Sequence, residues 1–217
     1  MPDPDRLPAA KRARSRTAGW QAERRAETRQ RLLDAAADTF GQMGYVGTRV
    51  EDILAAAQIG RTSFYKQFRD RLDVASVLFT QFMPHLEGVY IEIADCREID
   101  HLAVERWIER LIDAYAQHRG VMRLFAEVAA IEPAFSSTIA QVQTGIMRAL
   151  GVRFDGFARA VAADGGEPHA RAVLVIETLD HISAMISLRQ VPIDRPTAVR
   201  FAAGVFLDFI HSGPGDR

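Results

Sequence analysis

The sequence predicts an all-α protein, in which an N-terminal helix-turn-helix domain precedes a C-terminal helical domain. Apolar residues recur every three or four positions along most of the 217 residues, which places them on one face of each successive helix. Glycine, proline and polar runs interrupt this pattern, as they do at helix ends. Hydrophobic residues make up 48% of the chain, which is ample for a sizeable core in one or two compact units.

The first helix of the N-terminal domain is amphipathic and ends at Gly44. A second helix begins near Arg49, because Thr48 stands three residues before Glu51. In this spacing the hydroxyl and the carboxylate each accept a hydrogen bond from a free amide at the helix start. The residues expected to face the core are Leu32, Leu33, Ala36, Ala37, Phe40 and Met43 in the first helix, and Val50, Ile53, Leu54 and Ala57 in the second.

The apolar pattern restarts after Gly60, with Phe64 and Phe68 directed inward. Small side chains at the start of a helix in the major groove allow close approach to base edges, whereas Arg, Lys and Tyr bind phosphates. This segment supplies both kinds, and therefore indicates a helix that reads DNA. The alternative is an ordinary pair of helices with a solvated basic face. The residues expected to point outward are Arg61, Thr62, Ser63, Tyr65, Lys66 and Gln67.

A fourth helix follows directly. Asp70 is a good N-cap for it, and Arg71 lies in its first turn. An arginine there can join the free amides of the helix start on a neighbouring phosphate. We therefore expect Arg71 to contact DNA.

Residues 48–53, 57–61 and 63–68 together resemble the N-terminal domain of TetR-family transcriptional regulators. The ordered features are a long first helix ending in Phe40 and Gly44-Tyr45, a Thr-capped second helix and the Phe-Tyr-x-x-Phe tract. The resemblance implies an all-α homodimer that binds double-stranded operator DNA and releases it when a small molecule enters the C-terminal domain. It implies phosphate contacts by Thr48, Tyr65 and Arg71, and groove or backbone contacts by Arg61, Thr62, Ser63 and Lys66; we add the neighbouring Arg49 to the DNA-binding residues.

Two positions depart from the family pattern. Gln58 stands at the turn position where the family usually has Gly, and a non-glycine residue in the left-handed conformation costs on the order of 1 kcal/mol. Gly60 stands in place of the usual Ser cap, and Gly is a weaker but acceptable N-cap. Both bear on the approach angle of the DNA-reading helix.

Basic residues are concentrated in the N-terminal part of the chain. Residues 1–80 hold 14 Lys/Arg and 10 Asp/Glu, a net charge of +4, whereas residues 81–217 hold 13 and 18, a net charge of −5. This balance favours DNA binding by the first part. We expect residues 1–22 to form a basic flexible arm that contacts phosphates or the minor groove; the alternative is a solubilising tail. Its expected DNA contacts are Lys11, Arg12, Arg14 and Arg16.

We assign residues 23–72 to the helix-turn-helix domain and residues 73–217 to a C-terminal effector-binding and dimerisation domain. Helices are expected over 74–94, 102–117, 121–131, 133–163, 168–189 and 196–211. The last helix is apolar on almost every side, so that it must be covered on more than one side. Pairing with the preceding helix across a two-fold axis would supply that cover. The alternative is burial within one subunit. The preceding helix would contribute Val173, Ile176, Leu179, Ile182 and Ile186.

The middle helices carry bulky apolar residues, most of which must be core. If they enclose a cavity, its wall is mainly apolar, and a hydrophobic or aromatic effector is expected. The candidate ligand-binding residues are Phe82, Leu86, Trp107, Leu111, Tyr115, Phe125 and His181.

Other classes of protein are disfavoured. The sequence lacks a nucleophile elbow, a metalloprotease His-Glu-x-x-His pair, a P-loop and a dinucleotide fingerprint, so we expect no enzyme and no cofactor. One cysteine, Cys96, excludes an internal disulfide and a cysteine zinc site, and the six histidines show no ligand spacing. No apolar run is long enough to span a membrane, and no signal peptide is present, so we expect a cytoplasmic protein.

These observations together favour a homodimeric DNA-binding regulator. The direction of control, a repressor rather than an activator, comes from the resemblance alone. A helical adaptor that does not bind DNA is the remaining alternative.

Overall fold

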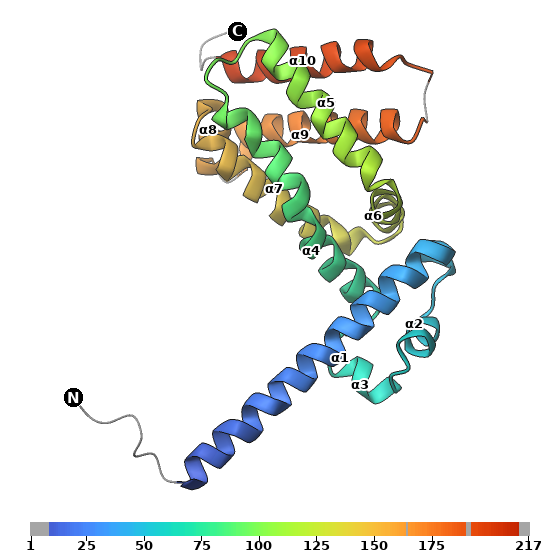
Figure 1. The fold of residues 1–217 in the computed structure, drawn as a ribbon. Helices are drawn as coiled ribbons and strands as arrows, with labels where there is room; N and C mark the ends of the chain where they lie inside the picture. The colour runs from blue at the N-terminus through green and yellow to red at the C-terminus, as the bar shows by residue number, and fades with distance from the viewer. Residues whose placement is uncertain (1–8, 164, 190–191, 213–217) are drawn as a thin grey trace, which may run out of the picture. The chain divides into compact units, whose positions relative to one another are not determined.

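The computed structural model describes residues 9–163, 165–189 and 192–212, and side chains from Gly19 onward. The chain divides into two compact units, Met1–Val74 and Ala75–Arg217. Every regular element within the described residues is a helix, as Figure 1 shows. The predicted all-α fold is therefore confirmed.

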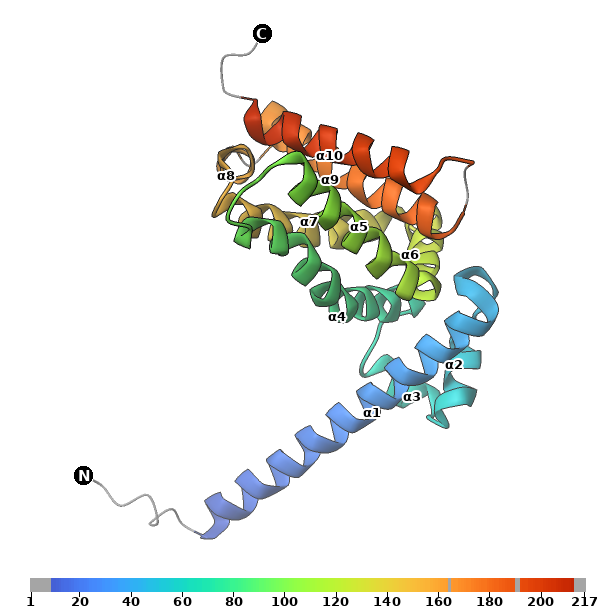
Figure 2. The same cartoon turned by 45° about the horizontal axis from the view of Figure 1, so that its top comes forward.

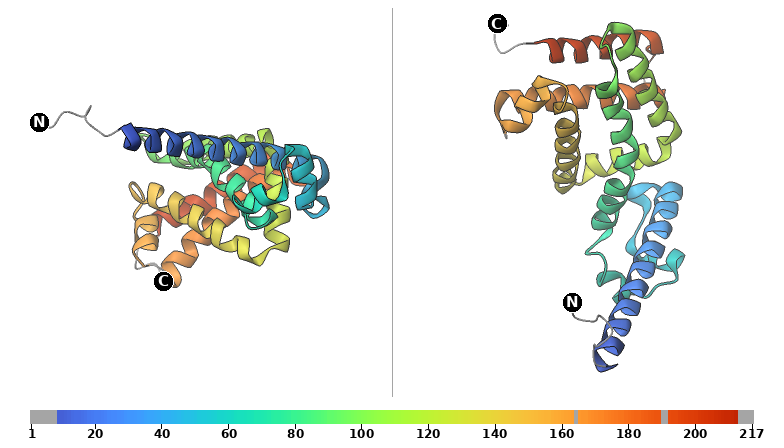
Figure 3. Two further views of the ribbon diagram at one scale, coloured as in Figure 1. Left: turned by 90° about the horizontal axis from the view of Figure 1, so that it is seen from below. Right: turned by 60° about the vertical axis from the view of Figure 1, so that its left-hand side comes forward.

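The first unit consists of α1 (Ala9–Gly47), α2 (Val50–Ala57) and α3 (Arg61–Tyr65). Figures 1 and 3 show α2 and α3 beside the C-terminal half of α1. Ala37 and Met43 were expected in the core but are exposed, because the buried face of α1 runs through Ala35 and Thr39 instead. The buried residues of this unit include Leu32, Leu33, Ala36, Phe40, Tyr45, Ile53, Ala57, Phe64 and Phe68.

The N-terminal half of α1 is helical where we expected a flexible arm. The helix begins at Ala9, and residues 19–27 are all exposed. This segment is rich in Ala, Arg and Glu, which have high intrinsic helix propensity and so favour a helix without tertiary packing. Residues 1–8 of the expected arm lie outside the described part of the chain.

Helix α4, which begins at Arg71, leads into the second unit. Asp100 caps α5 by accepting from the Ala103 amide at 2.7 Å, and Asp194 caps α10 by accepting from the Thr197 amide at 2.9 Å. Cys96, partly exposed, follows the first 3₁₀ turn. The elements are α4 (Arg71–Ile91), η1 (Glu92–Asp95), α5 (His101–Gln117), α6 (Arg119–Ile131), η2 (Pro133–Phe135), α7 (Ser136–Gly151), α8 (Asp155–Ala162), α9 (Gly166–Ser187) and α10 (Arg195–His211).

The single helix expected over 133–163 is wrong, because it is two helices joined by a sharp turn after Gly151. A Cβ atom at Gly151 would lie 3.0 Å from the Ala158 amide nitrogen and 3.1 Å from its Cα. Backbone atoms cannot yield to such a contact as a flexible side chain can. Glycine therefore permits the close approach of α7 and α8. The apolar periodicity continues across this turn, and so it predicted a single helix.

The last two helices lie side by side, and α5 packs against both (Figures 1 and 2). Ile176, Leu179 and Ile182 were expected to face a second subunit, but they are buried within the chain. Large apolar side chains that remain exposed on these helices are Leu174, 64% exposed, and Phe201, 62% exposed. Three of the five residues of α9 predicted to face a second subunit are thus buried within the chain, whereas Val173 and Ile186 are half-buried.

None of the described helices is both long and apolar enough to cross a membrane.

Candidate nucleic-acid interface and ligand cavity

The helix α3 is held to the first unit by two aromatic side chains. Phe64 is 0% and Phe68 2% exposed, and their ring centroids lie 5.8 Å apart. The predicted inward direction of both is confirmed. Arg61, Thr62, Tyr65 and Lys66 are exposed, and Ser63 and Gln67 are half-buried. The buried rings thus fix a short helix whose outer face is basic and hydroxyl-bearing.

The turn between α2 and α3 has the conformation expected at Gln58. Its φ of 55° and ψ of 44° are left-handed. The Ile59 amide donates to the Leu54 carbonyl at 3.1 Å and the Gln58 amide to the Ala55 carbonyl at 3.3 Å, the paired bonds that close a helix C-terminus. Gly60 is the N-cap of α3, with extended backbone angles. The turn therefore keeps the usual geometry despite both departures in sequence.

The exposed basic residues of this face belong to different elements. Arg61 on α3 lies 3.4 Å from Glu51 on α2, and both side chains are more than half exposed. Arg49 precedes α2 and is exposed. A solvent-exposed pair of this kind contributes little and can exchange its partner for a phosphate. These side chains give the unit a basic surface at α2 and α3.

The predicted cap at Thr48 is wrong by one residue. Arg49 is the N-cap of α2, and its amide donates to the Asp52 carboxylate at 2.8 Å. Thr48 is 0% exposed, and its hydroxyl donates to the Gly44 carbonyl at 2.7 Å. This bond closes the turn at Gly44, whose φ of 71° interrupts α1. The Thr48 hydroxyl is therefore not available to a phosphate.

Arg71 is bound within the protein. Its Nη1 donates to the Tyr45 carbonyl at 3.0 Å and to the Thr48 carbonyl at 2.8 Å, and the guanidinium lies 4.3 Å from the Tyr45 ring centroid. Carbonyl groups near helix ends lack intrahelical partners, and a guanidinium satisfies them well. Arg71 therefore has a structural role, and the phosphate contact expected of it stays a prediction.

Two further arginines have the same role. Arg31 Nη2 donates to the Ala57 carbonyl at the end of α2, at 2.7 Å, and Arg29 Nη1 donates to the Gln67 carbonyl after α3, at 3.0 Å. The Arg29 guanidinium also lies 4.3 Å from the Phe68 ring centroid. Part of the N-terminal positive charge therefore stabilises the fold.

The four residues of the arm that were expected to contact DNA lie in the helical backbone of α1. Their side chains are outside the described part of the structure. These residues are Lys11, Arg12, Arg14 and Arg16.

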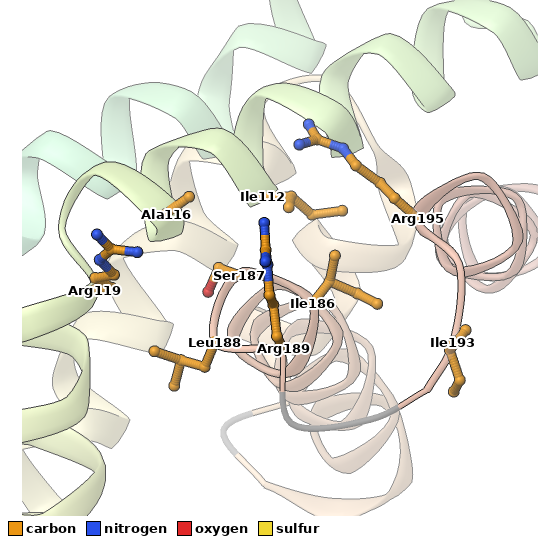
Figure 4. A pocket seen from close by; sticks show the side chains of 9 residues that line it. All are labelled: Ile112, Ala116, Arg119, Ile186, Ser187, Leu188, Arg189, Ile193 and Arg195. Atoms are coloured by element: carbon orange, nitrogen blue, oxygen red, sulfur yellow. The ribbon is translucent and has the colours of Figure 1, made fainter.

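The second unit contains a cavity of about 690 Å³ where the ends of α5 and α9 meet the start of α10 (Figure 4). Its wall combines apolar side chains with three arginines. Arg195 is paired with Asp113 at 2.7 Å and donates to the Glu109 carbonyl at 3.0 Å. Arg189 has a left-handed φ of 52°. The lining residues are Ile112, Ala116, Arg119, Ile186, Ser187, Leu188, Arg189, Ile193 and Arg195.

None of the seven predicted ligand-binding residues lines this cavity. Leu86, Trp107 and Leu111 are at most 1% exposed and fill the core, where the Trp107 indole donates to the Val89 carbonyl at 2.7 Å. His181 is exposed on α9. The others are Tyr115, described next, and Phe82 and Phe125, whose rings lie 6.0 Å apart in a separate aromatic cluster.

A partly buried carboxylate on α9 accepts hydrogen bonds from two buried tyrosines. Asp180 Oδ1 accepts from the Tyr90 hydroxyl at 2.5 Å and from the Tyr115 hydroxyl. Desolvation raises the pKa of Asp180 to about 6, against the smaller lowering effect of the two tyrosines. Burial, together with the neighbouring Asp180 charge, raises the pKa of both Tyr90 and Tyr115 well above its ordinary value. This cluster joins α4, α5 and α9.

Sequence reasoning missed the three arginines of the cavity, although a signal was present. Arg119 lies between the helices expected over 102–117 and 121–131, Arg189 ends the helix expected over 168–189, and Arg195 directly precedes the helix expected over 196–211. Helix ends that converge in space can bring such residues together. Their convergence depends on the helix packing, which periodicity does not specify.

Comparison with known proteins supports the first unit most directly. A profile of the family described as bacterial regulatory proteins, tetR family, matches residues 32–78. The HTH-type transcriptional repressor SCO4008 of Streptomyces coelicolor is 28% identical over 97 residues, which cover 45% of this chain. The match spans about half of that relative, 47% of its length.

Solved structures show a similar fold over nearly the whole length. The multidrug binding protein EbrR, complexed with imidazole, has a TM-score of 0.63 at 20% identity, covering 87% of this chain and 98% of its own. The fatty acid degradation regulator FadR from Bacillus halodurans has a TM-score of 0.58 at 16% identity, covering 88% of this chain and 97% of its own.

Proposed function

We propose that the chain is a cytoplasmic repressor of the tetR family, whose profile matches residues 32–78, and that it binds operator DNA as a homodimer and releases it when a small, mainly apolar effector binds. In this proposal residues 23–72 bind DNA, and residues 73–217 bind the effector and dimerise. The observation that carries it is the exposed face of α3, held in place by the buried rings of Phe64 and Phe68.

Direct DNA binding is the decisive test. We expect the chain to retard promoter DNA from beside its own gene, with log affinity falling linearly in log salt by about 0.9 for each phosphate neutralised. Tyr65→Ala and Lys66→Ala should weaken binding to all sites alike, whereas Thr62→Ala and Ser63→Ala should change base preference. Arg148→Ala, on the exposed surface of α7, is the control.

Two outcomes would select other functions. Binding to no DNA would favour the helical adaptor. Binding to the promoter with increased transcription from it would favour an activator of the same fold. If Tyr65→Ala bound every sequence as tightly as the parent chain, α3 would not be the DNA-reading helix.

The basic arm has its own test. Deletion of residues 1–18 should lower DNA affinity and reduce the salt slope, because it removes Lys11, Arg12, Arg14 and Arg16 while leaving the buried core intact. An unchanged slope would identify the segment as a solubilising tail.

Dimerisation is supported by the uncovered apolar side chains of α9 and α10. We propose that Leu174 and Phe201, both more than 60% exposed, lie in the interface. Phe201→Glu should shift the sedimentation coefficient to that of a monomer, since a charge there would be desolvated. Val152, which is 89% exposed before α8, gives the matched control Val152→Glu. Dimers that survive both Phe201→Glu and Leu174→Glu would contradict this interface.

A further inference from the structure

The cavity at the ends of α5 and α9 and the start of α10 is lined by arginine charge that acidic side chains neutralise only in part. Of its three arginines, Arg195 is engaged by Asp113 and by a backbone carbonyl. The side chains of Arg119 and Arg189, both exposed, make no hydrogen bond or ion pair with any residue that the structure describes. Figure 4 shows Arg189 extending from the end of α9 toward α5. Two like charges that share one opening favour an anion between them.

The rest of the wall is apolar. Ile112 is 1% exposed, Ile186 and Leu188 are half-buried, and Ile193 is 48% exposed at the rim. These side chains come from α5, from the end of α9 and from the segment before α10, so they surround the opening on several sides. A simple inorganic anion would leave this surface in contact with water. An occupant with an apolar part would cover it.

The volume sets the size of the occupant. Small-molecule sites in proteins enclose about 300–1,000 Å³, and this cavity lies within that range at about 690 Å³. We propose that the cavity binds an amphipathic anion, with a carboxylate or phosphate head at Arg119 and Arg189 and an aliphatic tail along Ile112, Ile186 and Leu188. The proposal deepens the proposed function by giving its effector a chemical class, and rests on it only where DNA release is concerned.

Calorimetric titration of the full-length chain tests the ligand class. The probes are decanoate, decyl phosphate, decanol, which has the same tail without charge, and acetate, which has a charge without the tail. We expect saturable binding of decanoate and decyl phosphate, at least tenfold weaker binding of decanol, and no saturable binding of acetate. A preference between the two anions distinguishes a carboxylate from a phosphate head.

Variants locate the site. Arg119→Gln and Arg189→Gln should each weaken decanoate binding about tenfold, because each removes one charge-assisted hydrogen bond. Ile193→Gln, at the rim, should weaken binding of the anion with the tail. The control is Arg148→Gln on α7, an exposed arginine outside the cavity. Circular dichroism of each variant verifies that the helices are intact.

Several outcomes would overturn the proposal. These are no saturable binding of either anion, equal affinity for decanoate and decanol, and affinity unchanged in both arginine variants. DNA retardation without ligand is measured separately. DNA retardation without anion binding would support the DNA-binding function and contradict only the proposed ligand of the cavity. Anion binding without DNA retardation would support the ligand and contradict the DNA-binding function.

Discussion

The two units use charged side chains in opposite ways. In the first unit Arg29, Arg31 and Arg71 each donate to a backbone carbonyl near the end of a helix. In the second unit the partly buried Asp180 accepts hydrogen bonds from two tyrosines. A small unit has little core, and hydrogen bonds at its helix ends add to its stability. A larger core can accommodate a carboxylate whose desolvation costs stability.

The largest expected effect tests the structural arginines. Arg71→Ala should destabilise the first unit by about 3 kcal/mol, because it removes two charge-assisted hydrogen bonds and leaves two carbonyls unsatisfied. Differential scanning calorimetry should show a lower transition temperature for this unit. Arg69, whose side chain is 87% exposed beside Asp73, gives the control Arg69→Ala, with an expected loss below about 0.5 kcal/mol. Equal effects of the two substitutions would end the distinction between structural and surface arginines.

The second expected effect tests the interior carboxylate. With a pKa raised from 3.8 to about 6, the folded chain binds this proton more tightly than the unfolded chain. The free energy of unfolding should therefore fall as the pH rises from about 4 to about 6, and then stay level. Asp180→Asn should remove this dependence and stabilise the second unit at pH 7 by on the order of 2 kcal/mol.

Urea denaturation across this pH range measures the effect. The control is Asp208→Asn, at an exposed position on α10, which should retain the decline. A chain in which Asp180→Asn is less stable than the parent at pH 7 would show that the tyrosine hydrogen bonds outweigh desolvation.

A smaller effect is expected at the turn before α3. Gln58→Gly should stabilise the first unit by about 1 kcal/mol, because glycine adopts the φ of 55° without a steric penalty. Gln58→Ala keeps the penalty and should give no gain. If both substitutions raised the thermal midpoint equally, the effect would come from the glutamine side chain and not from the backbone conformation.

The smallest effect is expected at the N-cap of α3. Gly60→Ser should add a few tenths of a kcal/mol, because a serine hydroxyl can accept from a free amide of the helix start. A Cβ atom at Gly60 has no neighbour within 4 Å, so the side chain fits. Gly60→Ala supplies the Cβ without the hydroxyl and should lower the midpoint. An increase in both variants would mean that reduced backbone entropy dominates at this position.

Local sequence signals predicted the helix ends and core residues best. Phe64 and Phe68 are buried as their spacing indicates, Gly44 interrupts α1, and the left-handed conformation falls on Gln58. Each depends on residues within one or two turns of chain. The cap of α2 was misplaced because Thr48 and Arg49 both precede an acidic residue by three positions, and only packing chooses between them.

Contacts between residues that are far apart in the sequence could not be predicted from such local signals. The bonds from Arg71 to the Tyr45 and Thr48 carbonyls were not predicted, because an exposed arginine and one that binds distant carbonyls look alike in sequence. The turn at Gly151 and the cavity arginines also depend on how helices converge. Periodicity shows which face of a helix is apolar, but it does not show whether the covering surface comes from the same chain, and this is why Ile176, Leu179 and Ile182 were assigned to an interface.

Cys96 gives the chain a single natural attachment point for a spectroscopic probe. It is the one cysteine in 217 residues, it is partly exposed, and its amide is fixed by a bond to the Ile93 carbonyl at 3.3 Å. A thiol-reactive spin label would mark each subunit once without any substitution. In the two-fold dimer that we propose, the two labels would form one pair, so double electron–electron resonance would yield one distance distribution and test whether operator DNA or decanoate changes the separation of the labels.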